Sequence, residues 1–299
     1  MKILVVGGAG MIGGHAALHL KNSGHEVTIA GRNPPPAGTP LGALPFLRVD
    51  YVNLEFDRAA LSQFDALVFA AGNDVRHKPQ EADDTYWHEA NSIGVPRFFA
   101  AAKAAGIKVA VNVGSFYPQA APQLVATNPY VASRQASDQS VVALADEGFR
   151  SMSINAPFVL GAVPGLVTMF QAYVQYAEGK FAPMPDFAPP GGTNFISCDS
   201  LSEAIEGGLT RGEPGGSYLV GDENMSFGDY FGAFFEAVGQ PKPPVIDQEH
   251  PMLPDGAIFF GRGNTLYYEV DPAVESLLGF RRNDVVPSVK QIVAQFRDA

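Results

Sequence analysis

The sequence is poor in cysteine, in positive charge and in long apolar runs. Its single cysteine, Cys198, cannot form an internal disulfide, which favours a reducing, cytoplasmic location. The 20 Lys and Arg residues are outnumbered by 31 Asp and Glu residues, and a net charge of −11 does not suit nucleic acid or an anionic membrane as a partner. No stretch approaches the roughly 20 apolar residues of a membrane-spanning helix, and none resembles a signal peptide. We therefore expect a cytoplasmic protein whose partner is a small-molecule substrate.

Short apolar runs alternate with helix-patterned segments over the first 160 residues. The runs expected to form buried strands are residues 3–6, 27–30, 46–49, 66–70, 108–113 and 151–156. The helices expected between them are residues 11–22, 56–63, 86–105 and 129–147. Strands separated by helices are typical of parallel βαβ units. The sequence therefore predicts an α/β fold with a doubly wound parallel sheet of the Rossmann type.

The pattern changes after Gly161. Two proline-rich stretches, residues 181–192 and 241–254, are surrounded by aromatic residues, which indicates irregular structure. We expect a dinucleotide-binding Rossmann domain over residues 1–160 and a smaller, irregular substrate-binding lobe over residues 161–299. Residues 193–221 read as strand, helix and strand, and we expect them to return to the first domain.

Gly7, Gly10 and Gly13 lie three residues apart between the first expected strand and the first expected helix. Glycine lets the backbone turn sharply and approach a ligand closely. The helix that follows presents free N–H groups and the positive end of its dipole. Glycine clusters also occur in ordinary tight turns, but this one lies at the first βα junction. It therefore predicts a site for the pyrophosphate of a dinucleotide.

The end of the second expected strand bears on the choice between NAD and NADP. NAD-specific folds place an acidic residue about 20 residues beyond the glycines, where it binds the ribose hydroxyls. Here the segment reads Ala30-Gly31-Arg32-Asn33, and Arg32 lies 19 residues after Gly13. A guanidinium can pair with a 2′-phosphate in a bidentate way, so NADP(H) is favoured over NAD(H). The alternative is a solvated arginine on a loop.

The turn Gly7-Gly8-Ala9-Gly10-Met11-Ile12-Gly13 resembles that of the extended short-chain dehydrogenase/reductase family, also called the NAD-dependent epimerase/dehydratase family. The resemblance continues along nearly the whole chain. It implies an NAD(P)-dependent oxidoreductase or epimerase in which Asp50 lies near the adenine and Ala70-Ala71-Gly72 form a turn that lines the cofactor. The full set of cofactor-binding residues that it implies beside Arg32 is Gly7, Gly10, Met11, Ile12, Gly13, Asp50, Ala70, Ala71, Gly72, Asn91 and Pro157.

The reactive core of this family is a tyrosine followed four residues later by a lysine. Here the segment reads Tyr130-Val131-Ala132-Ser133-Arg134, and the i, i+4 spacing places both ends on one helix face. By resemblance, Tyr130 exchanges a proton with the substrate carbonyl or hydroxyl oxygen, and Ser115 holds that oxygen by a hydrogen bond. Such a tyrosine must ionise well below the ordinary pKa of about 10, which requires a fixed positive charge beside it. The alternative is an ordinary tyrosine on an amphipathic helix.

Arg134 departs from the family's pattern. A guanidinium supplies the charge, but it does not readily lose a proton and is not equivalent to an ammonium group. Three interpretations remain open. In the first, Arg134 performs most of the functions of the family's lysine. In the second, the enzyme uses a different proton route. In the third, the site binds cofactor without efficient turnover.

The region after Gly161 carries few cations. Its basic side chains before Phe260 are Lys180, Arg211 and Lys242. The sequence also lacks the basic residue before Phe195 and the arginine before Pro157 that sugar-nucleotide members of the family often have. A diphosphate would need charge compensation here. An arginine from elsewhere, Arg76 or Arg262, is the alternative source of that charge.

These observations favour an NADP(H)-dependent oxidoreductase acting on a small, mostly uncharged carbonyl or hydroxyl compound. One alternative is a sugar-nucleotide epimerase or dehydratase with tightly bound NAD(P). The other is a catalytically weak dinucleotide-sensing protein. The family resemblance also implies a homodimer formed through the helices expected at residues 86–105 and 129–147.

Several other residues are weaker candidates. His15 and His19 have a spacing that can bind a metal, but no acidic or thiol ligand accompanies them in sequence, so we predict packing and no metal site. Cys198 has no neighbouring cation to activate it as a nucleophile. The residues that are candidates to border the substrate are His77, Lys78, Trp87, His88 and Tyr117.

Overall fold

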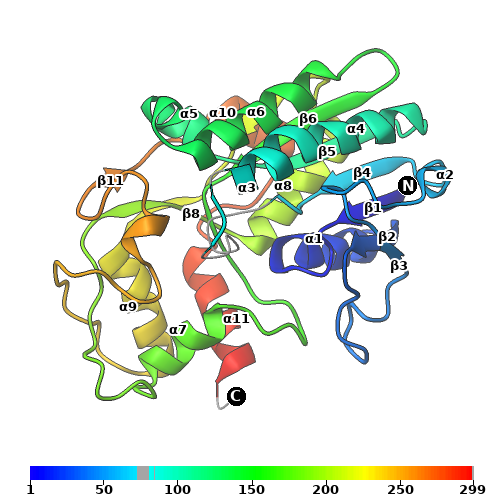
Figure 1. Ribbon diagram of the computed structural model, residues 1–299. Coiled ribbons are helices and arrows are strands. Elements are labelled where there is room, and N and C mark those ends of the chain that lie inside the picture. Colours follow the sequence, from blue (N-terminus) through cyan, green and yellow to red (C-terminus); the bar gives the residue numbers. More distant parts are fainter. Residues whose placement is uncertain (73–80, 84, 298–299) are drawn as a thin grey trace.

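The computed structural model describes residues 1–72, 81–83 and 85–297. Its larger unit is a seven-stranded sheet, parallel throughout, in the order β3-β2-β1-β4-β5-β6-β9 (Figure 1). The strands are β1 (Lys2–Val6), β2 (Glu26–Gly31), β3 (Phe46–Arg48), β4 (Ala66–Phe69), β5 (Val109–Ser115), β6 (Arg150–Ala156) and β9 (Ser217–Leu219). The predicted doubly wound sheet is confirmed.

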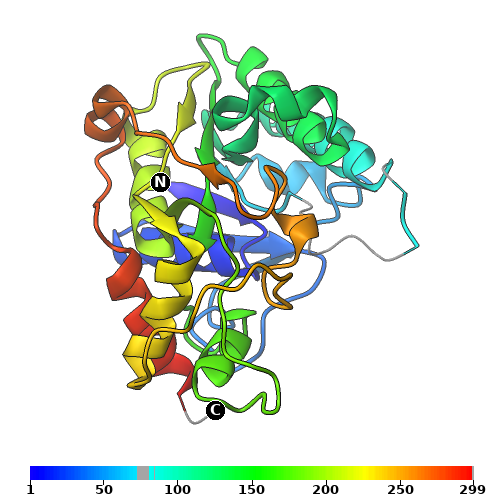
Figure 2. The same cartoon turned by 90° about the vertical axis from the view of Figure 1, so that its left-hand side faces the viewer.

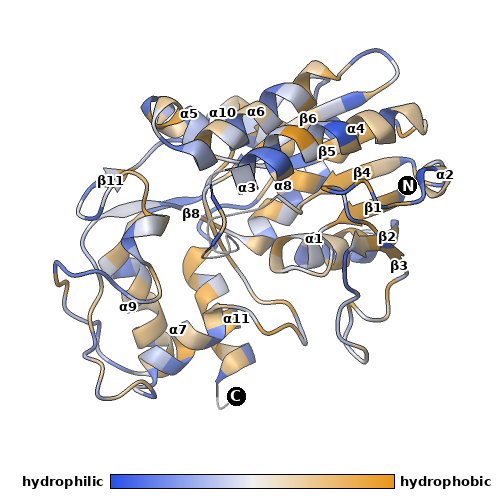
Figure 3. Ribbon diagram, viewed as in Figure 1, coloured by the Kyte–Doolittle hydropathy of each residue, from blue (hydrophilic) through white to orange (hydrophobic). Residues whose placement is uncertain are grey.

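Helices cover both faces of this sheet because its strands are apolar on both sides. Along β1, Ile3 and Val5 belong to the core beneath helices α1 and α8, whereas Leu4 and Val6 belong to the core beneath α4. Figure 3 shows β1 and β4 as predominantly hydrophobic ribbons. The covering helices are α1 (Met11–Asn22) and α8 (Cys198–Arg211) on one side, and α4 (Val95–Ala104) and α6 (Pro129–Ala143) on the other.

The single helix expected at residues 86–105 is three consecutive helical segments. These are α3 (Thr85–Trp87), the π-helix η2 (His88–Gly94) and α4. π-Helical turns are rare and occur mostly as local insertions within α-helices. Hydrophobic periodicity does not distinguish them from an α-helix, which is why the sequence predicts one regular helix. The remaining short elements near this face are α2 (Arg58–Leu61), α5 (Tyr117–Ala120) and η3 (Pro122–Ala126).

The smaller unit combines a mixed sheet with helices whose core is rich in aromatic side chains. Strand β8 is its centre, antiparallel to β10 and parallel to β7 and β11. Figure 2 shows α9 and α11 alongside each other below this sheet. The elements are β7 (Phe158–Leu160), α7 (Phe170–Ala177), β8 (Gly192–Ser197), β10 (Glu223–Ser226), α9 (Phe227–Val238), η4 (Asp255–Ala257), β11 (Thr265–Leu266) and α11 (Val285–Phe296). Helix α10 (Pro272–Leu278) packs instead on α8 and the core of the larger sheet.

The segment expected to return to the first domain divides between the two units. β8 lies in the smaller sheet, α8 packs on α1 and the larger sheet, and β9 pairs with β6 at the edge of the larger sheet. The chain therefore crosses between the units more often than a simple division at residue 160 implies. None of the helices in the described ranges is long and apolar enough to cross a membrane.

The order of the strands fixes where a ligand can bind. The chain runs outward from β1 to β2 and β3, then returns to place β4 on the other side of β1. In such sheets ligands bind at the carboxyl ends of the strands where the order reverses. The glycine turn follows β1 and the Ala70–Gly72 turn follows β4, so both lie at this point.

Candidate active site

The glycine turn is tightly built except on one side. Gly7 has φ +83°, a conformation that favours glycine, and a Cβ atom at Gly13 would overlap the carbonyl oxygen of Gly7. At Gly10 the nearest atom to an added Cβ is that same carbonyl oxygen, 3.4 Å away. Helix α1 begins directly after Gly10 and no side chain caps it. Its free N–H groups and open approach fit the pyrophosphate of a dinucleotide.

The turn after β4 packs directly against the glycine turn. A Cβ atom at Gly7 would lie 2.7 Å from the carbonyl oxygen of Ala70. The neighbouring carbonyl of Ala71 accepts a hydrogen bond of 3.0 Å from the Tyr51 hydroxyl. Burial raises the pKa of Tyr51 to about 12, so this phenol keeps its proton and holds the turn in place. The two turns thus form one continuous wall.

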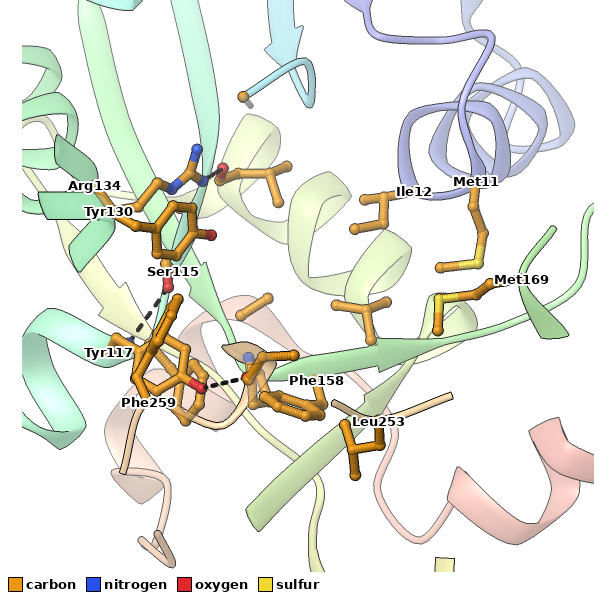
Figure 4. Close-up of a pocket in the computed structure, with 18 of the residues that line it drawn as sticks. Met11, Ile12, Ser115, Tyr117, Tyr130, Arg134, Phe158, Met169, Leu253 and Phe259 are labelled. Carbon is orange, nitrogen blue, oxygen red and sulfur yellow. Dashed lines mark hydrogen bonds between the residues drawn. The ribbon is translucent and has the colours of Figure 1, made fainter. Parts of the chain in front are cut away.

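A cavity of about 230 Å³ opens beside this wall, between the two units of the chain (Figure 4). It contains eight of the residues singled out from the sequence: Met11, Ile12, Ala70, Gly72, Ser115, Tyr130, Arg134 and Pro157. The structure therefore brings the expected catalytic residues and part of the expected cofactor set to one place. Tyr117, which the sequence marks as a weaker candidate, also lines the cavity.

Local sequence fixes the start of α6 and with it Tyr130. The side chain of Asn128 accepts a hydrogen bond from the Val131 N–H at 3.1 Å, which caps the helix one residue before Pro129. Tyr130 then lies in the first turn. Its ring packs against Trp87 and Phe259, with centroids 5.7 and 5.4 Å away. This packing orients the phenol toward the cavity.

Polar contacts behind the cavity hold α6 in register. The Ser133 hydroxyl donates to the carbonyl of Tyr130 at 2.7 Å, and the Asn91 amide of η2 donates to Ser133 at 3.1 Å. On the sheet side, the Asn155 amide donates to Asp138 at 3.1 Å. Asn91 is fully buried and does not line the cavity. Asn91 therefore lies behind α6, away from the cavity.

Arg134 is buried one helical turn after Tyr130. Its Nη2 donates a hydrogen bond of 2.7 Å to the carbonyl of Val113 on β5. Its Nε is buried and finds no hydrogen-bond partner in the described part of the chain. On the far side, a Cβ atom at Gly72 would overlap Nη1. The guanidinium therefore occupies a slot between β5 and the turn after β4.

Ser115 ends strand β5 at the same edge of the sheet. It is 8% exposed, and its hydroxyl lies 3.5 Å from the backbone N–H of Tyr117. The residue before it, Gly114, has no room for a side chain because the Asn155 amide lies against it. Figure 4 shows Ser115 close below the Tyr130 ring, with Arg134 above. The three side chains converge on one side of the cavity.

The other expected cofactor residues lie outside the cavity lining: Gly7, Gly10, Gly13, Arg32, Asp50, Ala71 and Asn91. Arg32 is exposed at the end of β2, and its charge acts on both Asp50 and Tyr51. The Asp50 carboxylate accepts hydrogen bonds from its own turn, including the backbone N–H groups of Val52 and Asn53. Arg76, His77 and Lys78 lie outside the described residues.

Cys198, His15, His19 and the exposed His88 lie outside the cavity lining. Cys198 is buried, and burial raises the pKa of its thiol, so it stays protonated. His15 and His19 face α8, where they contact Ser202 at 2.8 Å and Glu206 at 2.7 Å. The described residues hold no cluster of three or more His, Cys, Asp or Glu side chains suited to a metal.

Part of the cavity wall was not identified from the sequence. Residues 252–259 form a loop over the cavity, and the carbonyl of Met252 accepts a hydrogen bond of 2.8 Å from the Tyr173 hydroxyl. The lining residues from this loop are Met252, Leu253, Pro254, Ala257 and Phe259. The proline and aromatic content of the region was the only sequence signal, and it does not indicate which residues reach the site.

The four Lys and Arg side chains between residues 161 and 262 are engaged away from the cavity. Arg134 is the only charged side chain in the lining that the described residues form. Arg262 pairs with Asp255 at 2.9 Å and also with Asp247. The other contacts are Lys180 with Glu178, Lys242 with Asp229, and Arg211 with the carbonyls of Leu277 and Leu278. None of these cations is placed to neutralise a ligand in the cavity.

Comparisons with known proteins agree with this architecture. Residues 3–179 match the model of the NAD dependent epimerase/dehydratase family. Similar solved structures include a UDP-N-acetylglucosamine 4-epimerase from Bacillus cereus, with 16% identity, a TM-score of 0.76 and coverage of 100% of this chain and 97% of that one. A UDP-glucose-4-epimerase from Stenotrophomonas maltophila, solved with bound NAD and formylated UDP-arabinopyranose, has 18% identity, a TM-score of 0.76 and coverage of 100% and 98%.

A third similar structure is the enzyme WbmG from Bordetella bronchiseptica in complex with NAD, with 18% identity, a TM-score of 0.73 and coverage of 100% and 94%. A search of curated protein sequences found no match. At these levels of identity the similarity to solved structures concerns the fold.

Proposed function

This chain belongs to the NAD dependent epimerase/dehydratase family, and from that premise we propose that it is an NADP(H)-dependent oxidoreductase acting on a compact, mostly uncharged carbonyl or hydroxyl compound. The main support for this proposal is the polarity of the cavity lining. The hydroxyl-bearing side chains of Ser115 and Tyr130 open onto a cavity whose described lining has Arg134 as its only charged side chain. Such a cavity suits a neutral substrate.

The residues present fit a nicotinamide dinucleotide. The uncapped start of α1 and the open face of Gly10 suit its pyrophosphate, and Met11, Ile12 and Pro157 offer apolar contacts in the cavity. When bound, the dinucleotide supplies or accepts a hydride. Arg32 supports the choice of NADP(H), because an exposed guanidinium at the end of β2 can bind a 2′-phosphate.

The three catalytic residues have separate roles. Ser115 and Tyr130 hold the substrate oxygen, and Tyr130 donates its phenolic proton to that oxygen during reduction. Arg134, fixed by the Val113 carbonyl, supplies positive charge that stabilises the resulting phenolate. Since a guanidinium keeps its protons, Arg134 does not pass a proton onward. This geometry supports the interpretation in which arginine replaces the charge, but not the proton relay, of a lysine.

The second candidate is a sugar-nucleotide epimerase or dehydratase. The family match and the similar structures support it more than they support the oxidoreductase, because several of those structures are epimerases named for UDP-sugars. The cavity argues against it. A buried diphosphate needs paired cations, and Lys180, Lys242 and Arg262 are already paired with carboxylates.

A single assay separates the candidates. Purified protein is mixed with external NADPH and a panel of uncharged aldehydes and ketones, and separately with UDP-hexoses without added cofactor. We expect NADPH consumption in step with carbonyl reduction. Tightly held NAD and interconversion of UDP-hexoses would establish the epimerase instead. Reversible NADPH binding without turnover on either panel would favour the dinucleotide-sensing alternative.

The same proposal includes a homodimer. Helices α4 and α6, which the family resemblance implies as the dimer interface, lie side by side on the outer face of the larger sheet (Figure 1). Sedimentation analysis of the purified protein tests this part.

A further inference from the structure

We propose that the substrate carries an uncharged apolar arm several carbons long, which extends from its reacting oxygen toward Leu253. This inference rests on the proposed function and names its substrate class more closely. The two ends of the cavity differ in polarity. Figure 4 shows Ser115, Tyr130 and Arg134 gathered on one side, with Met169 and Leu253 away from them.

The wall around Leu253 is apolar and firmly packed. Leu253 is 6% exposed and belongs to the hydrophobic core of the smaller unit. Phe158 projects into the cavity from β7 and packs against Phe116 and Phe195, with ring centroids 6.1 and 5.8 Å away. Because these rings are held from behind, the wall presents a preformed apolar surface to a ligand.

Two tyrosine hydroxyl groups on this wall already donate hydrogen bonds within the protein. The Tyr173 hydroxyl donates to the carbonyl of Met252 at 2.8 Å, and the Tyr117 hydroxyl donates to the carbonyl of Ala257 at 3.3 Å. Burial raises the pKa of Tyr117, so it remains a proton donor in this bond. Both tyrosines therefore hold the loop over the cavity through their hydroxyl groups. A ligand would contact their aromatic rings and not their hydroxyl donors. Neither of these two hydroxyls would replace the hydrogen bonds to water that a polyhydroxylated sugar loses here.

The arm must also be uncharged at its end. Arg262, the cation nearest in sequence to the loop, is paired with Asp247 and Asp255. A carboxylate or phosphate at the end of the arm would be desolvated without a counter-charge from the described residues. The combination of a hydrogen-bonding end and a neutral apolar end fits an aldehyde, ketone or alcohol on an alkyl or aryl body.

The test measures binding without requiring turnover. Unreactive straight-chain amides from propanamide to octanamide are titrated into the NADPH-loaded protein by calorimetry. We expect affinity to rise about fourfold for each added methylene until the cavity is filled, with a negative heat-capacity change of binding. Affinity that stays flat or falls with chain length overturns the inference.

Two variants locate the arm. Leu253→Asn keeps the approximate size of the side chain but adds polarity, and Leu253→Met keeps it apolar as the matched control. We expect the gain per methylene to shrink in Leu253→Asn and to persist in Leu253→Met. Equal, wild-type gains in both folded variants would show that the arm does not run along Leu253. The wild-type amide series decides the question even if Leu253→Asn does not fold.

This design keeps the two proposals separate. A protein that binds longer amides more tightly but reduces no aldehyde contradicts the proposed function and retains the apolar site. One that reduces propanal and octanal equally well, with equal amide affinities, contradicts the apolar arm and retains the oxidoreductase.

Discussion

Arg134 and Gly72 fit together only because residue 72 has no side chain. A Cβ atom there would overlap Nη1 of Arg134, and the Nη2 bond to the Val113 carbonyl prevents the guanidinium from moving aside without loss. Gly72 has no positive φ, so alanine is conformationally allowed at this position. The requirement for glycine is therefore steric and is imposed by the arginine.

Gly72→Ala should lower kcat/KM by about tenfold or more, because the displaced guanidinium no longer supports Tyr130. In the double variant Gly72→Ala/Arg134→Lys, the slimmer lysine should restore part of the loss. A double-mutant cycle should give a coupling energy of about 1–3 kcal/mol. Additive effects of the two substitutions would contradict the steric link.

Tyr130→Phe should abolish turnover, with a loss on the order of 10²–10⁴ in kcat, because the phenolic proton is removed. Phenylalanine retains the ring contacts with Trp87 and Phe259, so cofactor affinity should stay within a few-fold. Tyr218→Phe, at the far edge of the larger sheet, is the control for losing a buried hydroxyl. An unchanged rate in Tyr130→Phe would refute the assigned acid.

Arg32→Ala should weaken NADPH binding by roughly tenfold to a hundredfold and leave NADH affinity nearly unchanged. The reason is that only NADPH has the 2′-phosphate. Fluorescence titration with both dinucleotides measures the effect. Arg58→Ala, at an exposed arginine on α2, controls for the same change of net charge. Equal losses for the two cofactors would show that Arg32 does not bind the 2′-phosphate.

Asn91→Leu should reduce the free energy of unfolding by about 1–3 kcal/mol, because it removes a buried donor to Ser133. Turnover should fall with it, since Ser133 in turn contacts the backbone of Tyr130. NADPH affinity should remain close to that of the native protein. A large loss of affinity at unchanged stability would instead establish the cofactor contact that the family resemblance implies.

His250 should make stability depend on pH. Its ring lies among Tyr176, Phe187 and Phe231, and burial lowers its pKa from 6.5 to about 4. As the pH falls, the unfolded state binds the proton first. This contribution to stability is therefore complete above pH 6.5, declines as the pH falls to about 4, and totals roughly 3 kcal/mol.

Urea unfolding at a series of pH values measures this effect. In His250→Phe the decline over the same pH range should be smaller by that amount, because the titrating group is gone. A variant with the same pH dependence as the native protein would contradict the assignment to His250.

Local patterns were sufficient to predict much of the fold. Features that depend on residues close together in sequence were predicted correctly. They are the glycine turn, the bounds of helix α1 and the spacing of Tyr130 and Arg134. The contacts of Leu253 and Phe259 with the cavity depend instead on packing between distant segments, which periodicity does not encode. The π-helical turn around Asn91, which packs against α6, was also missed, because hydrophobic periodicity does not distinguish it from an α-helix.

Any side chain at residue 72 would overlap Arg134. Substitutions at these two positions can therefore accumulate in only one order during evolution. A lineage with a side chain at 72 acquires arginine at 134 without harm only after the first position has become glycine. Once the arginine is present, reversion at 72 is blocked until 134 changes again. The pair is thus a local case of epistasis, in which the effect of a substitution at one position depends on the residue at the other.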